Sequence, residues 1–363
     1  MNYFDHLMKI FDKGNNMFSG IDLFSDTVTK PTLAMRKAIL NAEVGDEQKG
    51  EDPTTKQLEE MIADKLGFEN ALFLPSATMA NQIALHTLCE RGDELFAAGN
   101  CHLFRSEVGG PAIHANVMCR PIYTSSGKFT VAQLKQCHEE LHGIHNPRAK
   151  LISVENTTNM GGGIPWTKEE LSEIITYARH HHLKTHMDGS RFFNAHIATA
   201  LNPKDIANGF DMVTICLSKG LGCPVGALLV FNNNYYDKVR RLKQLMGGAM
   251  RQSGIIAAAG IYALQHHIDR LKIDHDNAKL LAQNLHDLPL IKLLDIPPAT
   301  NIVIFEWQSS KISASEFLAL CVTNGVRFSQ ISNTRLRAVT HLGIMQEDII
   351  RAHKIIADIV KNL

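Results

Sequence analysis

Short apolar runs alternate with longer helical stretches along most of this 363-residue chain. Strand character is found at residues 70–75, 93–99, 151–156, 183–189 and 212–218. Between these runs lie segments such as 55–68 and 167–182, whose apolar residues recur at helical spacing. Strands that alternate with helices of about 12–15 residues predict a mostly parallel sheet with helices on its faces.

A smaller domain is predicted to follow this sheet. From residue 252 a long helical run to 285 leads into strand-like segments and a final helix. We therefore expect an N-terminal extension over residues 1–20, a large domain over 21–274 and a small C-terminal α+β domain over 275–363.

Two strand ends carry the most chemistry, because ligands of such sheets bind beyond the carboxyl ends of the strands. Asp188 ends the run "LKTHMDG", and Lys219 follows "MVTICLS" in a glycine-rich turn. A lysine beside small residues can form an imine with an aldehyde, and a carboxylate can hold a protonated pyridine nitrogen. Pyridoxal phosphate needs both groups from its protein. A solvated lysine, and a helix cap or ion pair made by Asp188 with Arg191, are the structural alternatives.

Other loops offer weaker signals of a binding site. The segment "PSATMAN" places free backbone N–H groups at a strand-to-helix turn, which suits a phosphate, although Ser76 or Thr78 can equally cap a helix there. The segment "ENTTNMGGG" at 155–163 predicts a flexible loop that lines a pocket. Arg251 and Arg337 have the side chain that captures carboxylates in a bidentate manner, but isolated arginines are more often surface charges.

Composition excludes several classes of protein. Lys plus Arg and Asp plus Glu both number 37, so no global basic field indicates nucleic acid or an anionic membrane. The seven cysteines form no CxxC pair, which argues against a disulfide framework and fits a reducing cytoplasm. Residues 1–20 lack the apolar core of a signal peptide, and no run of 18 apolar residues predicts a membrane span. We expect a cytoplasmic protein.

One short motif points to a different chemistry. Residues 138–142 read HEELH and match the zinc-peptidase pattern HExxH. The surrounding stretch is polar and predicts an exposed helix and turn, with His145 as the near candidate for a third ligand. We therefore expect no metal site here and keep a zinc hydrolase as a distant alternative.

Nine ordered segments carry a family resemblance that covers residue 21 to the C-terminus. They are "DLFSDTVTKPT", "VGDEQKGEDPT", "LPSATMANQ", "HLFRSEVGGPA", "VENTTN", "HMDGSRFFNA", "CLSKGLGCPVG", "GGAMRQSGIIAAAGIYAL" and "RAVTHL". The chain resembles the low-specificity L-threonine aldolases, which are fold-type-I pyridoxal phosphate enzymes related to the β-eliminating lyases. The resemblance implies a seven-stranded, mostly parallel sheet, and a homotetramer whose active sites are shared across a dimer interface.

The resemblance also implies roles for single residues. Lys219 corresponds to the imine lysine, Asp188 to the partner of the pyridine nitrogen, and Arg191 to a ligand of the ring oxygen. His102 corresponds to a catalytic histidine that stacks on the ring. The remaining cofactor contacts correspond to Ala77, Thr78 and Ser218. The substrate contacts correspond to Ser25, Arg251, Arg337, Thr158 and Lys49.

The implied reaction is cleavage of L-threonine or L-allo-threonine into glycine and acetaldehyde. Four positions depart from the family pattern. Thr158 stands where a histidine is common, Lys49 replaces tyrosine, Gln244 stands where lysine is frequent, and Ala77 replaces glycine. Threonine cannot act as a base at neutral pH, so His102 or an ordered water must do so. The alternatives are β-elimination, another carbon–carbon lyase reaction, and a weakly catalytic cofactor-binding homologue.

Overall fold

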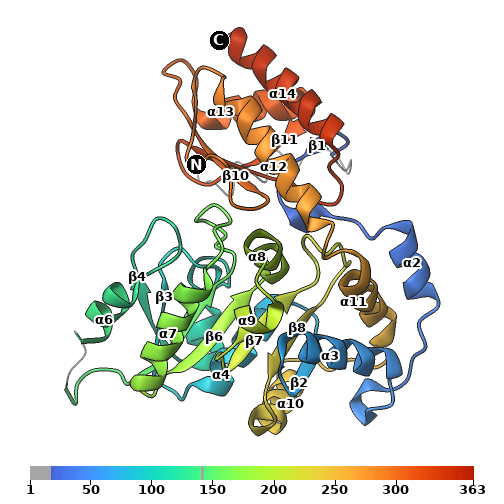
Figure 1. The fold of residues 1–363 in the computed structure, drawn as a ribbon, viewed down its shortest axis with the longest axis vertical. Helices are drawn as coiled ribbons and strands as arrows, with labels where there is room; N and C mark the ends of the chain where they lie inside the picture. The colour runs from blue at the N-terminus through green and yellow to red at the C-terminus, as the bar shows by residue number, and fades with distance from the viewer. Residues whose placement is uncertain (1–17, 140–142) are drawn as a thin grey trace.

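A twisted sheet forms the centre of the larger lobe in this computed structural model, which describes residues 18–139 and 143–363 (Figure 1). Its seven strands stand in the order β2-β8-β7-β6-β5-β3-β4. Their bounds are Asn70–Leu74 (β2), Glu94–Ala98 (β3), Met118–Ile122 (β4), Ala149–Glu155 (β5), Lys184–Gly189 (β6), Met212–Cys216 (β7) and Ala227–Phe231 (β8). Only β8 runs against its neighbours, β2 and β7, among these described strands. The expected mostly parallel, seven-stranded sheet is confirmed.

Helices cover both faces of this sheet. The connection from β2 to β3 crosses the sheet in one direction, whereas those from β4 to β5 to β6 to β7 return in the other. Since such crossovers are right-handed, their helices lie on opposite faces. The helices of this lobe are Leu33–Leu40 (α2), Pro53–Leu66 (α3), Ala77–Leu88 (α4), His102–Arg105 (α5), Val131–Glu139 (α6), Lys168–His180 (α7), Phe192–Thr199 (α8), Pro203–Ala207 (α9), Tyr236–Leu245 (α10) and Gly254–His266 (α11).

Several short turns complete the larger lobe. They are the 3₁₀ turns Asp26–Val28 (η1), Glu47–Lys49 (η2) and Asn233–Tyr235 (η4), and the π-helical segment Pro111–Ala115 (η3). Helix boundaries follow local chemistry: Asp52 caps α3 by accepting from the backbone N–H of Thr55, and Gly67 ends it in the left-handed region at φ 80°. None of the described helices is both long and apolar enough to cross a membrane.

The long helical run predicted from residue 252 is two helices, which corrects the single stretch expected from periodicity. Helix α11 ends at His266, and α12 spans Leu271–His286. Between them, Nδ1 of His267 contacts the backbone oxygen of Leu221 at 2.7 Å, and the Arg270 guanidinium pairs with Asp274 in the first turn of α12. These contacts fix a turn inside a segment whose apolar spacing predicts one helical run.

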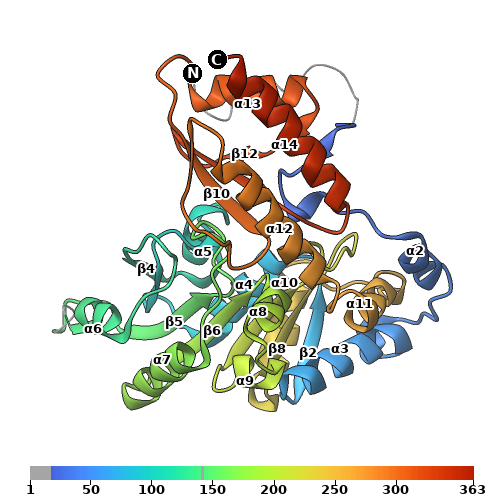
Figure 2. The same cartoon turned by 45° about the horizontal axis from the view of Figure 1, so that its top comes forward.

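The smaller lobe stands above the carboxyl ends of the sheet strands (Figure 2). It holds an antiparallel sheet of order β12-β13-β10-β9, and a parallel pair β1 with β11. The strands are Ile21–Asp22 (β1), Ile291–Leu293 (β9), Ile302–Trp307 (β10), Val326–Arg327 (β11), Ser329–Gln330 (β12) and Arg335–Val339 (β13). Helices α12, Ala314–Thr323 (α13) and Gln346–Lys361 (α14) belong to this lobe (Figure 1).

Each lobe has its own main hydrophobic cluster, and the smaller lobe has a further small one formed by Ile302, Ile304 and Val339. The smaller lobe's main cluster draws on α12, α13 and α14, and also includes Ile21 and Leu23 from the start of the described chain. The N-terminal strand therefore packs with the C-terminal lobe. The division into residues 21–274 and 275–363 stays a prediction. Strand β1, at the start of the first of these ranges, pairs with β11 in the second.

Candidate active site

The site is built on the ends of two adjacent parallel strands. Glu155 ends β5 and is the register partner of Asp188 on β6, so two carboxylates lie side by side in the interior. Burial opposes ionisation of Asp188, but the charges of His102 and Lys219 and the hydrogen bond from Ser190 outweigh it and lower its pKa. Burial and the charge of Asp188 raise the pKa of Glu155. Asp188 thus holds the negative charge of the pair.

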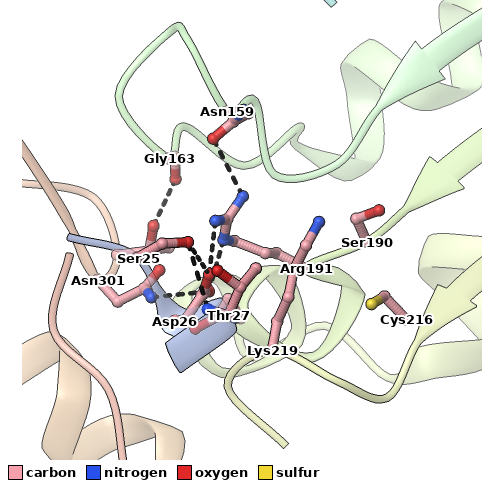
Figure 3. Close-up of polar contacts among 12 residues, drawn as sticks. Ser25, Asp26, Thr27, Asn159, Gly163, Ser190, Arg191, Cys216, Lys219 and Asn301 are labelled. Carbon is pink, nitrogen blue, oxygen red and sulfur yellow. Dashed lines mark hydrogen bonds and ion pairs between the residues drawn. The ribbon is translucent and has the colours of Figure 1, made fainter. Parts of the chain in front are cut away.

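Lys219 approaches this pair from the next strand of the sheet. It follows β7 in the half-buried turn that begins at Ser218, and the hydroxyl of Thr29 donates to its backbone oxygen over 3.0 Å. Figure 3 shows its side chain running beside that of Arg191. Strand end and turn therefore place the Lys219 amine close enough to Asp188 for its charge to lower the pKa of that carboxyl.

Arg191 is held by a buried carboxylate that comes from the start of the chain. Its Nε donates to Oδ2 of Asp26 and its Nη2 donates to Oδ1, both over 2.7 Å (Figure 3). The Arg191 charge overcomes burial and keeps the pKa of Asp26 well below its usual range. Asn301 of the smaller lobe also donates to Asp26 over 3.3 Å. Ser25, the preceding residue, is buried and caps the short turn η1.

Asn159 connects the two lobes at this point. Its Oδ1 accepts from Nη1 of Arg337 over 2.7 Å and from Nη1 of Arg191 over 3.3 Å. Its backbone N–H donates to Oε2 of Glu155 over 3.0 Å. Arg337 lies on β13 of the smaller lobe, so that lobe contributes a guanidinium to the site. This guanidinium shares the amide oxygen of Asn159 with Arg191.

His102 lies on the other side of Asp188, at the start of α5. Its Nδ1 is 2.8 Å from Oε1 of Glu107, and its backbone N–H donates to Glu155 over 3.2 Å. Nδ2 of Asn81 donates to both Glu107 and Asp188, over 2.8 and 2.9 Å. Burial works against a charged ring, but Glu107 and Asp188 raise the pKa of His102.

The start of α4 offers the backbone groups predicted for a phosphate. Ser76 is the N-cap and accepts from the N–H of Met79, while Ala77 is half-buried and Thr78 is exposed. The N–H groups of a helix's first turn have no intrahelical partner and favour an anion. Both alternatives weighed from the sequence, a cap and an anion site, are compatible with this geometry.

Three of the predicted site residues lie outside this cluster or are covered. Lys49 is exposed, and Arg251 is exposed and pairs with Asp46 over 3.0 Å. Thr158 is fully buried, and its hydroxyl accepts from the N–H of Ile164 over 3.2 Å, so it closes the loop after β5. Gln244, where the family often has lysine, is exposed on α10.

The HExxH motif falls partly outside the described residues, because the structure does not describe 140–142. Of its two described members, His138 has Nδ1 at 2.8 Å from the hydroxyl of Tyr177. That side chain therefore forms part of the packing between α6 and α7.

Four polar residues of the site were not selected from the sequence: Asp26, Asn81, Glu107 and Asn159. All four lie inside segments that carry the family resemblance, close to residues that were selected: "DLFSDTVTKPT", "LPSATMANQ", "HLFRSEVGGPA" and "VENTTN". The pairing of Asp26 with Arg191 was not recognisable, because the two are 165 positions apart and nothing in the sequence pairs them.

This geometry fits a pyridine ring bearing a phosphate. A buried, ionised Asp188 can hold a protonated ring nitrogen, the Lys219 amine lies beside it, and the open end of α4 follows β2 at the edge of the same sheet. His102 supplies a flat ring on the opposite side of the Asp188 carboxylate from Lys219's strand. The fit rests on residues brought together from four strand ends.

Known proteins match the chain over most of its length. The model of the beta-eliminating lyase family matches residues 22–310. The low specificity L-threonine aldolase of Escherichia coli (strain K12) is 43% identical over 267 residues, which cover 74% of this chain and 79% of that protein. Low-specificity L-threonine aldolase 1 of Arabidopsis thaliana is 35% identical over 333 residues, covering 91% and 93%. A threonine aldolase structure from Leishmania major superposes with a TM-score of 0.79 at 20% identity, covering 94% of this chain and 99% of that chain.

Proposed function

Because this chain belongs to the beta-eliminating lyase family, we propose that it is a pyridoxal-phosphate-dependent lyase that cleaves β-hydroxy amino acids. Its substrates are L-threonine and L-allo-threonine, and its products are glycine and acetaldehyde. The observation that carries the proposal is the convergence of Lys219, His102 and an ionised Asp188 at the ends of parallel strands. Relatives of 43% and 35% identity that bear the name of this activity support it.

Residues of this chain would supply each cofactor contact. Asp188 would hold the pyridine nitrogen, Lys219 the aldehyde carbon, and His102 would cover the ring. Arg191, already fixed by Asp26, would bind the ring oxygen with its remaining N–H groups. Ala77 and Thr78 at the start of α4, together with Ser218, would hold the phosphate. When bound, pyridoxal phosphate supplies an electron acceptor for the pair released from the Cα–Cβ bond.

The substrate carboxylate is held by Arg337 and Ser25. Arg337 is a suitable clamp because a guanidinium can make two parallel charge-assisted hydrogen bonds to a carboxylate, and its Nη1 already donates to Oδ1 of Asn159 in the site. A clamped carboxylate restricts rotation about the Cα bonds and sets the Cα–Cβ bond for cleavage. Ser25 lies next to Asp26 and its hydroxyl donates to Oδ1 of that residue, so its side chain lies in the same pocket.

The proton of the β-hydroxyl passes to His102. Thr158 is fully covered in the loop after β5 and is not titratable, so it offers no base. The His102 side chain, in contrast, is 26% exposed, so its ring is not fully covered. A positioned histidine base contributes about 10²–10⁴-fold to a rate.

Assembly completes the site in this proposal. Lys49 and Arg251 are exposed, and Arg251 pairs with Asp46. A homotetramer with shared active sites lets these side chains serve the substrate of a neighbouring chain. Light scattering on the purified protein measures this: a monomer at micromolar concentration contradicts the assembly. The seven free cysteines support a reducing, cytoplasmic location.

A screen of β-hydroxy amino acids for aldehyde release tests the function. Purified holoenzyme should release acetaldehyde and glycine in equal amounts from L-threonine or L-allo-threonine. The glycine measured without added substrate, and reactions with L-alanine, serve as blanks. Absence of aldehyde from every β-hydroxy amino acid rejects the proposal and favours a weakly catalytic cofactor-binding protein.

β-Elimination is the second candidate, and the burial of Thr158 favours it. The beta-eliminating lyase family is named for elimination, and this chain lacks a titratable group at position 158. Elimination leaves an oxo acid and ammonia rather than glycine and an aldehyde. The same reactions assayed for ammonia therefore separate the two activities.

A further inference from the structure

Three side chains of the site form a compact polar group that the proposed reaction uses only in part. The nitrogen and oxygen atoms of His102, Glu107 and Asp188 lie within 4.8 Å of one another among the described residues. The Asn81 amide joins them, because Nδ2 donates to Oε1 of Glu107 and to Oδ2 of Asp188. Asn81, Glu107 and Asp188 are all buried, at 1%, 4% and 1% exposure.

Glu107 acts purely as an acceptor in this group. Its carboxylate is approached by nitrogen atoms of His102, Asn81 and Gln82. Since the side-chain oxygens of Glu107 are fully covered, no solvent contact competes with these donors. Because an ionised carboxylate can only accept hydrogen bonds, Asn81 and Gln82 donate to it from their NH₂ groups and His102 donates from Nδ1–H. Nε2 is then the ring position whose protonation can change.

The threonine at position 158 gives His102 a larger part in the proposed reaction. The family commonly has a histidine there, and this chain has a fully covered threonine bonded to Ile164. Proton removal from the β-hydroxyl therefore falls to one histidine rather than being divided between two.

Building on the proposed lyase function, we propose that Glu107 is a positioning residue for His102 and that Asn81 ties this pair to Asp188. Glu107 holds Nδ1–H, so Nε2 faces the substrate with its lone pair. The O–H bond of the substrate breaks as the N–H bond forms at Nε2. The electron pair left on oxygen becomes the second C–O bond of the aldehyde while the Cα–Cβ bond breaks.

The charged groups around the ring set the direction of its pH dependence. Glu107 and Asp188 favour the protonated ring, whereas Lys219 and burial oppose it, and the net effect raises the pKa of His102. A base must be deprotonated to act, so activity falls as pH drops through this pKa. Removing the Glu107 charge lowers the pKa and shifts the acid limb of the profile to lower pH.

The test compares Glu107→Gln with Glu94→Gln in the holoenzyme. Glu94, the first residue of β3, is a matched control because it is also buried and pairs with a basic side chain, Arg120 on β4. E107Q should lower kcat/KM by about 10²-fold and move the acid limb to lower pH, with cofactor affinity unchanged. E94Q should keep the wild-type profile. An unmoved acid limb in E107Q overturns the proposal, because a purely structural Glu107 affects the amount of active enzyme and not the pH profile.

A second variant examines the link to Asp188. Asn81→Leu removes the amide that donates to both carboxylates while keeping the branched shape of the side chain. Because one donor serves both, N81L should shift the acid limb and also weaken cofactor binding, whereas E107Q changes only the first. Cofactor affinity of N81L equal to wild type overturns the bridging role.

An NMR titration separates this inference from the function on which it rests. Holoenzyme with ¹³C-labelled histidine gives a His102 signal, identified by its loss in His102→Gln. The ring pKa should be lower in E107Q than in wild type, whether or not aldehyde is released. An unchanged pKa rejects the positioning role. A lowered pKa with no aldehyde from any substrate rejects only the proposed function.

Discussion

Asp26 and Arg191, 165 positions apart in the sequence, form a bidentate ion pair with both N–O distances at 2.7 Å and no appreciable exposure of either side chain. The pair joins the first turn of the described chain to the strand end that carries Asp188. It also fixes the guanidinium beside Lys219 (Figure 3). A buried guanidinium that lost this partner would remain charged in the interior.

Asp26→Asn should therefore reduce the free energy of unfolding by about 3–5 kcal/mol, the cost of leaving one member of a buried pair uncompensated. Urea denaturation of the cofactor-free protein at pH 7 measures it. Asp276→Asn is the control, because its exposed pair with Lys272 is worth about 0–1 kcal/mol. The Asp26 pKa is lowered by folding, so its contribution is present above about pH 4 and lost as pH falls. A D26N deficit that grew on acidification would contradict this sign.

Glu155→Gln should show the opposite pH dependence. Folding raises the pKa of Glu155, so the folded state holds a proton that the unfolded chain releases at lower pH. Stability is greatest below the unfolded value of about 4.3 and falls as pH rises through the folded value. Glu155 accepts hydrogen bonds from the backbone N–H groups of His102 and Asn159. Glutamine can accept only one of them, and its NH₂ faces the other N–H. This contact lowers the free energy of unfolding of E155Q by about 1 kcal/mol at pH 5.

The deficit of E155Q relative to wild type should shrink between pH 5 and pH 8, because wild type loses stability over this range and the variant does not. Urea denaturation at three pH values measures the trend. Glu60→Gln, on the exposed face of α3 beside Lys56, should give a difference that does not depend on pH. A deficit that widens with pH would refute the raised pKa.

Arg337→Lys should raise KM for the amino acid with a much smaller change in kcat. A lysine cannot make two parallel hydrogen bonds to a carboxylate. Loss of a charge-assisted bond is worth about 1.5–3 kcal/mol, or about 10- to 150-fold in KM. Arg335→Lys is the matched control on the same strand, because Arg335 pairs with Glu306 at a partly exposed position. Equal effects in both variants would remove Arg337 from the substrate site.

Lys219→Ala should abolish the covalent attachment of cofactor that borohydride fixes in wild type. Absorbance after reduction, followed by mass spectrometry of the peptide that contains residue 219, measures it. Lys184→Ala is a suitable control, since Lys184 lies at the opposite end of the sheet and pairs with Asp211. Persistence of fixed cofactor in K219A would assign the linkage to another lysine.

The strand-end residues could be predicted because one rule governs them. In a parallel sheet the carboxyl ends meet at one edge, so Asp188 and Lys219 were expected together from the order of apolar runs alone. The predicted strands around them were confirmed, with β8 as the strand that reverses direction. The roles of these residues remain proposals.

Long-range partners could not be predicted by the same means. The Asp26–Arg191 pair and the position of Ser25 depend on how the first turn returns to the sheet, which no local pattern encodes. The break between α11 and α12 depends on a contact from His267 to Leu221, whereas the apolar spacing of the segment predicts one continuous helical run. The burial of Thr158 depends on the path of the loop that it closes.

The first strand of the described chain gives the two lobes a mechanical connection. Ile21 and Asp22 pair with β11 in the smaller lobe, and four residues later Asp26 grips Arg191 in the larger one. Residues 22–26 are therefore a short covalent link between the β1–β11 pair and the buried guanidinium of Arg191. Oδ1 of Asn159 makes a second link, because it accepts from both Arg191 and Arg337. A change in the position of the smaller lobe relative to the larger one must therefore alter contacts that Arg191 makes.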